Sequence, residues 1–384
     1  MLTDERIGTS VDSEKKQTPL LRYLYFYLID GCNLNCRHCW INPRSQVSPG
    51  AIPGVFLDFD LFKSIVQQAK PFGLRGIKLT GGEPLLHPRI VDILAFLQKE
   101  EFSVVLETNA VLCSTEFAKK LSALKNIFVS VSVDGSCSQT HDWIRQSEGS
   151  FAAAIKGIQT FVSSGIRPQI IMTIMRRNKG EIEQLIKMAE GLGIESVKFN
   201  ITQPTARATT LQENGETLTI AELVSLGTWI ERELSKKTSL RIVYSHPPAF
   251  QPLGKLYATT KDFCGACGVL NILGVLANGS YALCGIGQTV PELVFGHAAS
   301  DRLIDVWQHN AALTALRQGL PHKLEGICQA CLMKSRCRGH CIAENFSMHK
   351  NLWAGYWYCE AAYQQGLFPL SRLSPKHKNV SVSN

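Results

Sequence analysis

The chain has 384 residues, 45% of them apolar, and a formal net charge of +8 at pH 7. This size predicts a large buried core and more than one domain. No apolar run approaches the roughly 20 residues that span a bilayer, and residues 1–18 lack the apolar stretch of a secretory signal. We therefore expect a cytoplasmic protein without a membrane partner. No basic stripe with interleaved aromatic residues is present, so no nucleic-acid partner is expected.

Strands and helices alternate through the first 200 residues. We predict strands at about 21–30, 76–80, 102–108, 127–133, 168–175 and 195–201, and helices at about 58–70, 88–99, 114–123, 150–164 and 180–191. Segments 41–56 and 202–217 are expected to be loops, and 219–235 a helix. Alternation of this kind predicts a parallel sheet with right-handed crossovers. Six units predict an α/β fold with an open partial (β/α)6 barrel, whose chemistry lies at the carboxyl ends of the strands.

Thirteen cysteines are far more than ordinary usage. In a chain of this length without a secretory signal they predict metal ligands in a reducing compartment rather than disulfides. The cysteine-rich second half follows a linker rich in proline. We expect a disordered N-terminus over 1–18, a barrel over 19–215, a helical linker over 216–260, a cysteine-rich domain over 261–365 and a mobile basic tail over 366–384.

Three cysteines follow the first strand with the spacing CxxxCxxC: Cys32, Cys36 and Cys39. A four-iron cluster normally takes four thiolates. Three on one loop leave one iron without a protein ligand, and such an iron can coordinate a cofactor. The alternatives are a zinc site that lacks a ligand, or reactive thiols that lie close together by chance.

A Gly-Gly-Glu-Pro sequence ends the next strand, with Gly81, Gly82, Glu83 and Pro84. Together with CxxxCxxC it resembles the radical S-adenosylmethionine (radical SAM) enzymes. In that family an open iron binds SAM, an electron from the cluster splits the sulfonium, and a 5′-deoxyadenosyl radical results. The resemblance implies that Cys32, Cys36 and Cys39 are the catalytic cluster ligands and that the Gly-Gly-Glu-Pro motif holds the SAM amino group.

Further cofactor-binding candidates end later strands or follow them. Arg145 matches the family's arginine that pairs with the SAM carboxylate, although a surface arginine at a helix start is the alternative. For the Asp-Gly pair after the fourth strand, the alternative to a cofactor contact is an ordinary turn. For the serines of that strand, the alternative is that they only fill space as small side chains. The candidates besides Arg145 are Glu107, Ser132, Asp134 and Asn200.

Eight cysteines lie between 264 and 359, a number that fits two sets of four. Zinc ribbons are the alternative, since paired CxxC hooks also bind zinc. The pattern resembles the SPASM domain, which implies two auxiliary clusters and three [4Fe–4S] clusters in all. By that resemblance the set for the auxiliary cluster nearer to the barrel is Cys264, Cys267, Cys284 and Cys341, and the set for the farther one is Cys328, Cys331, Cys337 and Cys359. If only one of Cys264 and Cys267 is a ligand, the first auxiliary cluster keeps an open iron.

The resemblance implies a substrate class as well. Segments 21–27, 283–287 and 291–296 resemble maturases of ribosomal peptides with Nif11-type leaders, and within these the spliceases that excise a tyrosine-derived tyramine. The implied partners are a precursor peptide, a small separate leader-binding protein, and a reductant such as flavodoxin or ferredoxin. The alternatives are epimerisation, with Cys137 as the hydrogen donor, thioether or carbon–carbon crosslinking, and a non-catalytic zinc-binding scaffold.

Overall fold

The structure is a computed structural model that describes residues 18–45, 54–257 and 267–375. Its strands are β1 (Tyr23–Tyr27), β2 (Gly31–Cys32), β3 (Arg44–Ser45), β4 (Gly76–Thr80), β5 (Ser103–Thr108), β6 (Ile127–Ser132), β7 (Gln169–Ile174), β8 (Ser196–Ile201), β9 (Arg241–Tyr244), β10 (Ile272–Val275), β11 (Ser280–Ala282) and β12 (Val294–His297). Strands β1, β4, β5, β6, β7 and β8 pair in parallel in that order. This confirms the predicted six-stranded partial barrel.

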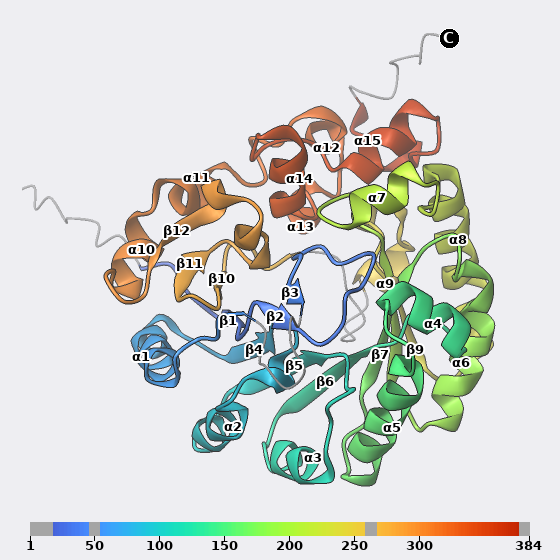
Figure 1. Cartoon of the computed structure of the whole chain (residues 1–384). Coiled ribbons are helices and arrows are strands. Elements are labelled where there is room, and N and C mark those ends of the chain that lie inside the picture. The colour runs from blue at the N-terminus through green and yellow to red at the C-terminus, as the bar shows by residue number, and fades with distance from the viewer. Residues whose placement is uncertain (1–17, 46–53, 258–266, 376–384) are drawn as a thin grey trace, which may run out of the picture.

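Helices cover the outer side of this sheet, as Figure 1 shows for α1, α2, α3, α5 and α6. The helices are α1 (Phe59–Ala69), α2 (Ile90–Gln98), α3 (Thr115–Ser122), α4 (Ser138–Arg145), α5 (Ser150–Ser163), α6 (Ile182–Gly191), α7 (Ala208–Glu213), α8 (Ile220–Arg232), α9 (Leu253–Tyr257), α10 (Leu303–His309), α11 (Ala311–Gly319), α12 (Gly326–Ala330), α13 (Lys334–Cys337), α14 (Ile342–His349) and α15 (Trp357–Gln364). The first begins where the Asp58 side chain accepts hydrogen bonds from two backbone amides. It buries side chains at helical spacing, namely Phe62, Ile65, Val66 and Ala69.

The sheet is wider than the six predicted strands. Its order is β12–β11–β10–β1–β4–β5–β6–β7–β8–β9, so one ten-stranded sheet runs through the barrel and into the cysteine-rich region. Strand β9 lies within 216–260, which the sequence predicted to be a helical linker, and it pairs in parallel with β8. Strand β10 pairs in parallel with β1. Both additions cover strand edges whose amide and carbonyl groups would otherwise be unpaired.

Two segments expected to lack regular packing are ordered. The predicted loop over 202–217 contains the short helix α7. Within the predicted mobile tail over 366–384, Phe368 and Leu373 are buried, and the Arg372 guanidinium donates hydrogen bonds to two backbone carbonyls that follow β9. The tail prediction is therefore wrong for this part, because its apolar residues complete the core of the cysteine-rich region. Residues 1–17 and 376–384, also predicted to be mobile, lie outside the described residues. In the described part of the chain, no helix is both long and apolar enough to cross a membrane.

Candidate active site

The cysteine loop lies at the carboxyl end of β1, beside the end of α4. The backbone amides of Asn35 and Arg37 donate to carbonyls in the last turn of α4, at 3.3 and 2.9 Å. The side chains of Cys32, Cys36 and Cys39 all line one cavity of about 210 Å3. The loop and helix together therefore hold the three thiols and Arg145, which follows Cys36 by 109 residues in the sequence, around one space.

The Gly-Gly pair at the end of β4 is packed against the chain that leads into this loop. A Cβ at Gly82 would lie 1.8 Å from the carbonyl oxygen of Gly31. Gly81 has φ +137°, a conformation that side chains strongly disfavour, and a Cβ there would lie 2.6 Å from the Ile29 oxygen. Glycines at these two positions therefore let the end of β4 lie close to the backbone before Cys32.

We expect Gly82→Ala to displace the cysteine loop, because the new methyl group overlaps the Gly31 carbonyl. A displacement of about 1 Å at reacting groups can cost about 100-fold in rate. Iron content and the rate of 5′-deoxyadenosine formation from SAM measure the effect. Gly180→Ala is the matched control, since nothing lies within 4 Å of its added methyl group. Equal rates in the two variants would contradict this account.

Glu83 is 1% exposed and its carboxylate is held by β5. Oε1 accepts from the Thr108 hydroxyl at 2.6 Å and Oε2 from the Asn109 amide at 2.8 Å. Burial raises the pKa of Glu83 to about 7, although these hydrogen bonds oppose the rise. The side chain lines the cavity, so a cation bound there would find a carboxylate fixed in place.

Arg145 is buried at the C-terminal end of α4, not at a helix start on the surface. Its Nη2 lies 2.7 Å from Asp134 Oδ2, and its Nη1 donates to the Cys36 sulfur at 3.5 Å. Burial lowers the pKa of His38 to about 4, so this ring beside Asp134 is neutral at pH 7. Within the described residues the Arg145 Nε has no hydrogen-bond partner although it is buried. It is a donor still available for a carboxylate.

Most of the predicted site residues line this one cavity. They are Cys32, Cys36, Cys39, Gly81, Gly82, Glu83, Glu107, Ser132, Arg145 and Asn200. Pro84 and Asp134 do not line it. Pro84 begins the turn after the Gly-Gly pair, and Asp134 is fully buried behind Arg145, where it holds the guanidinium.

Several residues of the cavity were not among the predicted cofactor contacts. Asn109 Nδ2 donates to the Asn33 side chain at 2.8 Å and so joins the end of β5 to the cysteine loop. Lys78 does not line the cavity, but its Nζ lies 2.6 Å from the carboxylate of Glu107, which does line it and is therefore already paired. Polar residues at strand ends were a usable signal for Asn109. No local signal indicated that Lys78, in the middle of an apolar strand, would form a pair inside the barrel.

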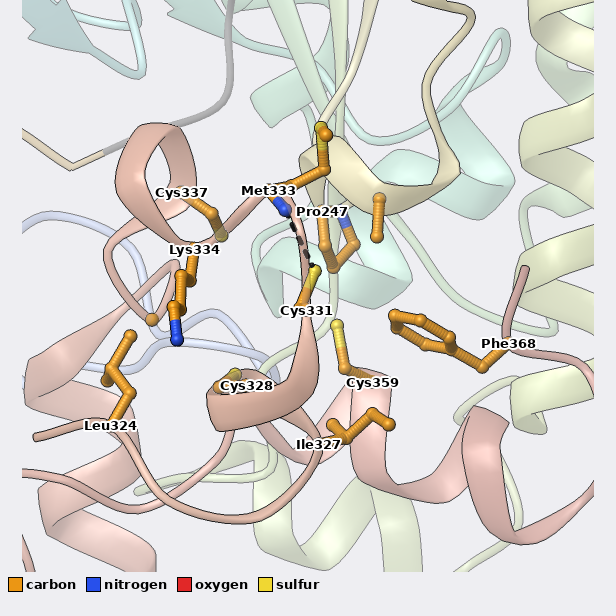
Figure 2. Close-up of a pocket in the computed structure, with 12 residues that line it drawn as sticks. Pro247, Leu324, Ile327, Cys328, Cys331, Met333, Lys334, Cys337, Cys359 and Phe368 are labelled. Carbon is orange, nitrogen blue, oxygen red and sulfur yellow. Dashed lines mark hydrogen bonds between the residues drawn. The ribbon is translucent and has the colours of Figure 1, made fainter. Parts of the chain in front are cut away.

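The four cysteines of the predicted farther set line a second pocket together. Figure 2 shows Cys328, Cys331, Cys337 and Cys359 around it, with apolar side chains such as Ile327 and Phe368. Two backbone amides donate to these sulfurs: Met333 to Cys331 at 3.3 Å, and Tyr356 to Cys328 at 3.4 Å. Hydrogen bonds to the ligating sulfurs help to set the reduction potential of an iron–sulfur cluster.

Three of the four cysteines in the nearer set are also close enough for their charges to interact. Burial, followed by the thiolate of Cys267, raises the pKa of Cys284 to about 12. Burial, Glu344, and then Cys267 and Cys284 raise the pKa of Cys341. Cys264 lies outside the described residues, so Cys267 is the cysteine of this pair that the structure describes.

The thiol groups fit iron–sulfur clusters by donor type, because cysteine thiolates are the usual ligands of [4Fe–4S] clusters. Three of them line the cavity, and four line the second pocket. Burial, then Glu83 and Cys36, raise the pKa of Cys32. Metal binding takes the deprotonated thiolate, so it would release this proton.

Comparison with known families decides the class. The radical SAM superfamily matches residues 26–189, and the SPASM iron–sulfur cluster-binding domain matches residues 264–332. The chain is a radical SAM/SPASM enzyme. Such enzymes depend on SAM and on [4Fe–4S] clusters, which agrees with a cavity lined by three thiols and with a second pocket lined by four.

The relatives of this radical SAM/SPASM enzyme differ in what they make. The AdoMet-dependent heme synthase of Methanosarcina barkeri is 26% identical over 334 residues, covering 83% of this chain and 90% of its own length. The mycofactocin maturase MftC of Mycobacterium tuberculosis is 25% identical over 335 residues, covering 84% and 78%. SuiB of Streptococcus suis, solved with its precursor peptide SuiA, superimposes with a TM-score of 0.68 at 17% identity over 89% of this chain and 76% of SuiB. That similarity shows a shared fold.

Proposed function

We propose that this radical SAM/SPASM enzyme modifies a ribosomally made precursor peptide, and that the modification is the excision of a tyrosine-derived tyramine that leaves an α-keto-β-amino acid. The observation that carries the radical chemistry is the single cavity shared by three thiols, Glu83 and Arg145 at the carboxyl end of the sheet. The fold shared with SuiB, which was solved with a precursor peptide, supports a peptide substrate. The tyramine reaction rests on the resemblance of segments 21–27, 283–287 and 291–296 to spliceases.

The residues around the cavity divide the work of holding SAM. Glu83 accepts from the SAM amino group, and Arg145 donates through its unpartnered Nε to the SAM carboxylate. Asp134 orients Arg145 and does not touch SAM. The cluster on Cys32, Cys36 and Cys39 supplies, when bound, the electron that splits SAM into methionine and a 5′-deoxyadenosyl radical. Glu107, Ser132 and Asn200 line the wall that faces the adenosine and the substrate.

The cysteine-rich region holds the auxiliary clusters in this proposal. Cys328, Cys331, Cys337 and Cys359 would hold the farther one, and Cys284, Cys341 and the Cys264–Cys267 pair the nearer one. A cluster with four protein ligands transfers electrons or stabilises the fold and does not bind SAM. A small separate leader-binding protein would present the peptide.

Glu83 predicts a pH dependence of SAM binding. Burial raises its pKa to about 7, and the carboxylate accepts a stronger, charge-assisted hydrogen bond from the SAM ammonium group than the protonated acid does. We therefore expect the KM for SAM to fall as pH rises through about 7 and to level off above it. Glu83→Gln should have a higher KM that no longer changes over this range. A wild-type KM that rises with pH between about 6 and 8 would contradict this role.

Co-expression with candidate precursor peptides tests the reaction. Mass spectrometry of the purified peptide should show loss of a tyramine unit at one tyrosine, and Cys36→Ala should leave the peptide unmodified. An unchanged mass with a D-residue would indicate an epimerase, and loss of two hydrogens a crosslinking enzyme. The heme synthases among the relatives make a tetrapyrrole the second candidate substrate. Turnover of a tetrapyrrole such as Fe-coproporphyrin III, which is named for another relative, with no peptide modified would overturn the proposal.

A further inference from the structure

We call the cavity lined by Cys32, Cys36 and Cys39 the SAM cavity. A groove of about 290 Å3 lies on the side of the cysteine loop that faces away from it. Along the loop, Leu34, Cys36 and His38 line the cavity, whereas Asn35 and Arg37 line the groove. The two spaces share no lining residue. The groove therefore lies directly behind the first cluster, and the backbone between two cluster ligands forms part of its floor.

Arginines lie in and beside this groove: Arg37 lines it, and Arg177 flanks it through its contact with Trp143. The guanidinium groups of Arg37 and Arg177 lie 4.3 and 4.2 Å from the ring centroid of Trp143, and Arg37 Nε also donates to the Trp143 carbonyl at 3.0 Å. Neither arginine forms an ion pair with a carboxylate within the described residues. Arg207 adds a third positive charge at the edge, and Glu216 is the acidic residue that lines the groove.

Arg207 joins the groove to the wall of the cavity. Its Nε donates to the Asn42 side chain at 2.7 Å and its Nη2 to the Pro43 carbonyl at 2.8 Å. Pro43 lines the SAM cavity on the other side. The positive surface is therefore held in a fixed position relative to the cluster loop, because hydrogen bonds secure it at both ends.

We propose that this groove is the docking surface for an acidic one-electron carrier protein with a low-potential flavin or iron–sulfur centre. Each cleavage of SAM consumes one electron: the C5′–S bond breaks, methionine and the 5′-deoxyadenosyl radical form, and the donor is oxidised by one electron through the cluster. A protein donor must bring its centre close to the cluster. Positive charges without carboxylate partners, placed behind the cluster loop, complement an acidic donor at that position. This inference rests on the radical SAM chemistry of the proposed function and not on the peptide substrate.

The test compares two electron sources in SAM cleavage without peptide. Purified acidic flavodoxin, kept reduced, is the protein donor, and dithionite is the small donor that needs no docking surface. For Arg177→Glu we expect the half-saturating flavodoxin concentration to rise about tenfold at low ionic strength, where charge steering is strongest. Its rate with dithionite should stay at the wild-type level. Arg37→Gln should shift the flavodoxin dependence in the same direction, and Arg177→Lys should shift it much less.

Arg167→Glu is the matched control. Arg167 is exposed and precedes β7, whereas Arg177 follows β7. The same charge change is therefore placed at the opposite end of this strand. We expect this variant to behave as wild type with both donors. An unchanged flavodoxin dependence in Arg177→Glu would overturn the docking surface. An equal loss with dithionite, or a raised peptide KM under dithionite, would overturn it too, since the residue would then act on folding or on the peptide. Absence of SAM cleavage by wild type with dithionite would instead overturn the proposed function.

Discussion

Replacing Cys36 by alanine should abolish the formation of 5′-deoxyadenosine from SAM. The three thiols of the loop line the same cavity, and Arg145 donates to the Cys36 sulfur. The substitution therefore removes one of the proposed cluster ligands and a contact of the arginine proposed to bind SAM. A cluster with two cysteines left on the loop is not retained. Of about twelve irons in protein reconstituted without oxygen, we expect about four to be lost. Liquid chromatography of the nucleoside and an iron assay measure the two effects.

Cys113→Ala is the control for this prediction. Its thiol is half-buried, its sulfur contacts the Ser114 carbonyl at 3.9 Å, and it lines neither the cavity nor the pocket of four thiols. We expect wild-type iron content and wild-type SAM cleavage. Nucleoside formation by Cys36→Ala at the rate of this control would mean that the first cluster is held elsewhere.

Asp134→Asn should destabilise the fold more than any exposed charge substitution. The carboxylate is fully buried and lies 2.7 Å from the Arg145 guanidinium. Its other oxygen, Oδ1, accepts from the Thr173 amide at 2.8 Å. Removing one partner of a buried pair leaves the other charge uncompensated, which costs about 3–5 kcal/mol. The midpoint of anaerobic urea unfolding of the apoprotein measures the loss, and the KM for SAM reports the displaced arginine.

Asp305→Asn removes the acid of an exposed pair with Arg302 and should leave the midpoint almost unchanged. The pH dependence gives a second check. Burial opposes ionisation of Asp134, but Arg145 and His38 outweigh it and lower its pKa below the ordinary value. The stabilisation is therefore present above about pH 4 and is lost as pH falls through the folded-state pKa. The stability difference between wild type and Asp134→Asn should shrink in acid. A difference that grows in acid would contradict the assignment of the charge to Asp134.

The sequence alone determined the class of chemistry and the core of the fold. Short spacings carry that information, because residues on one loop stay together whatever the rest of the chain does. CxxxCxxC and Gly-Gly-Glu-Pro predicted the cavity that contains Cys32, Glu83 and their neighbours. Alternating apolar segments predicted the six parallel strands, since strand and helix periodicities are local properties.

Tertiary structure decided what depends on contacts between distant residues. Only the fold shows that Asp134 is fully buried and forms an ion pair with Arg145. Only the fold shows that β10 pairs with β1 and so extends the barrel sheet. It also shows that Phe368 and Leu373 belong to the core, and that arginines 140 residues apart meet at Trp143. Side-chain burial and charge pairing arise from packing between segments whose separation along the chain carries no local pattern. For the same reason the sequence indicated the reaction type of this enzyme, and the surface through which electrons would enter it could be inferred only from the structure.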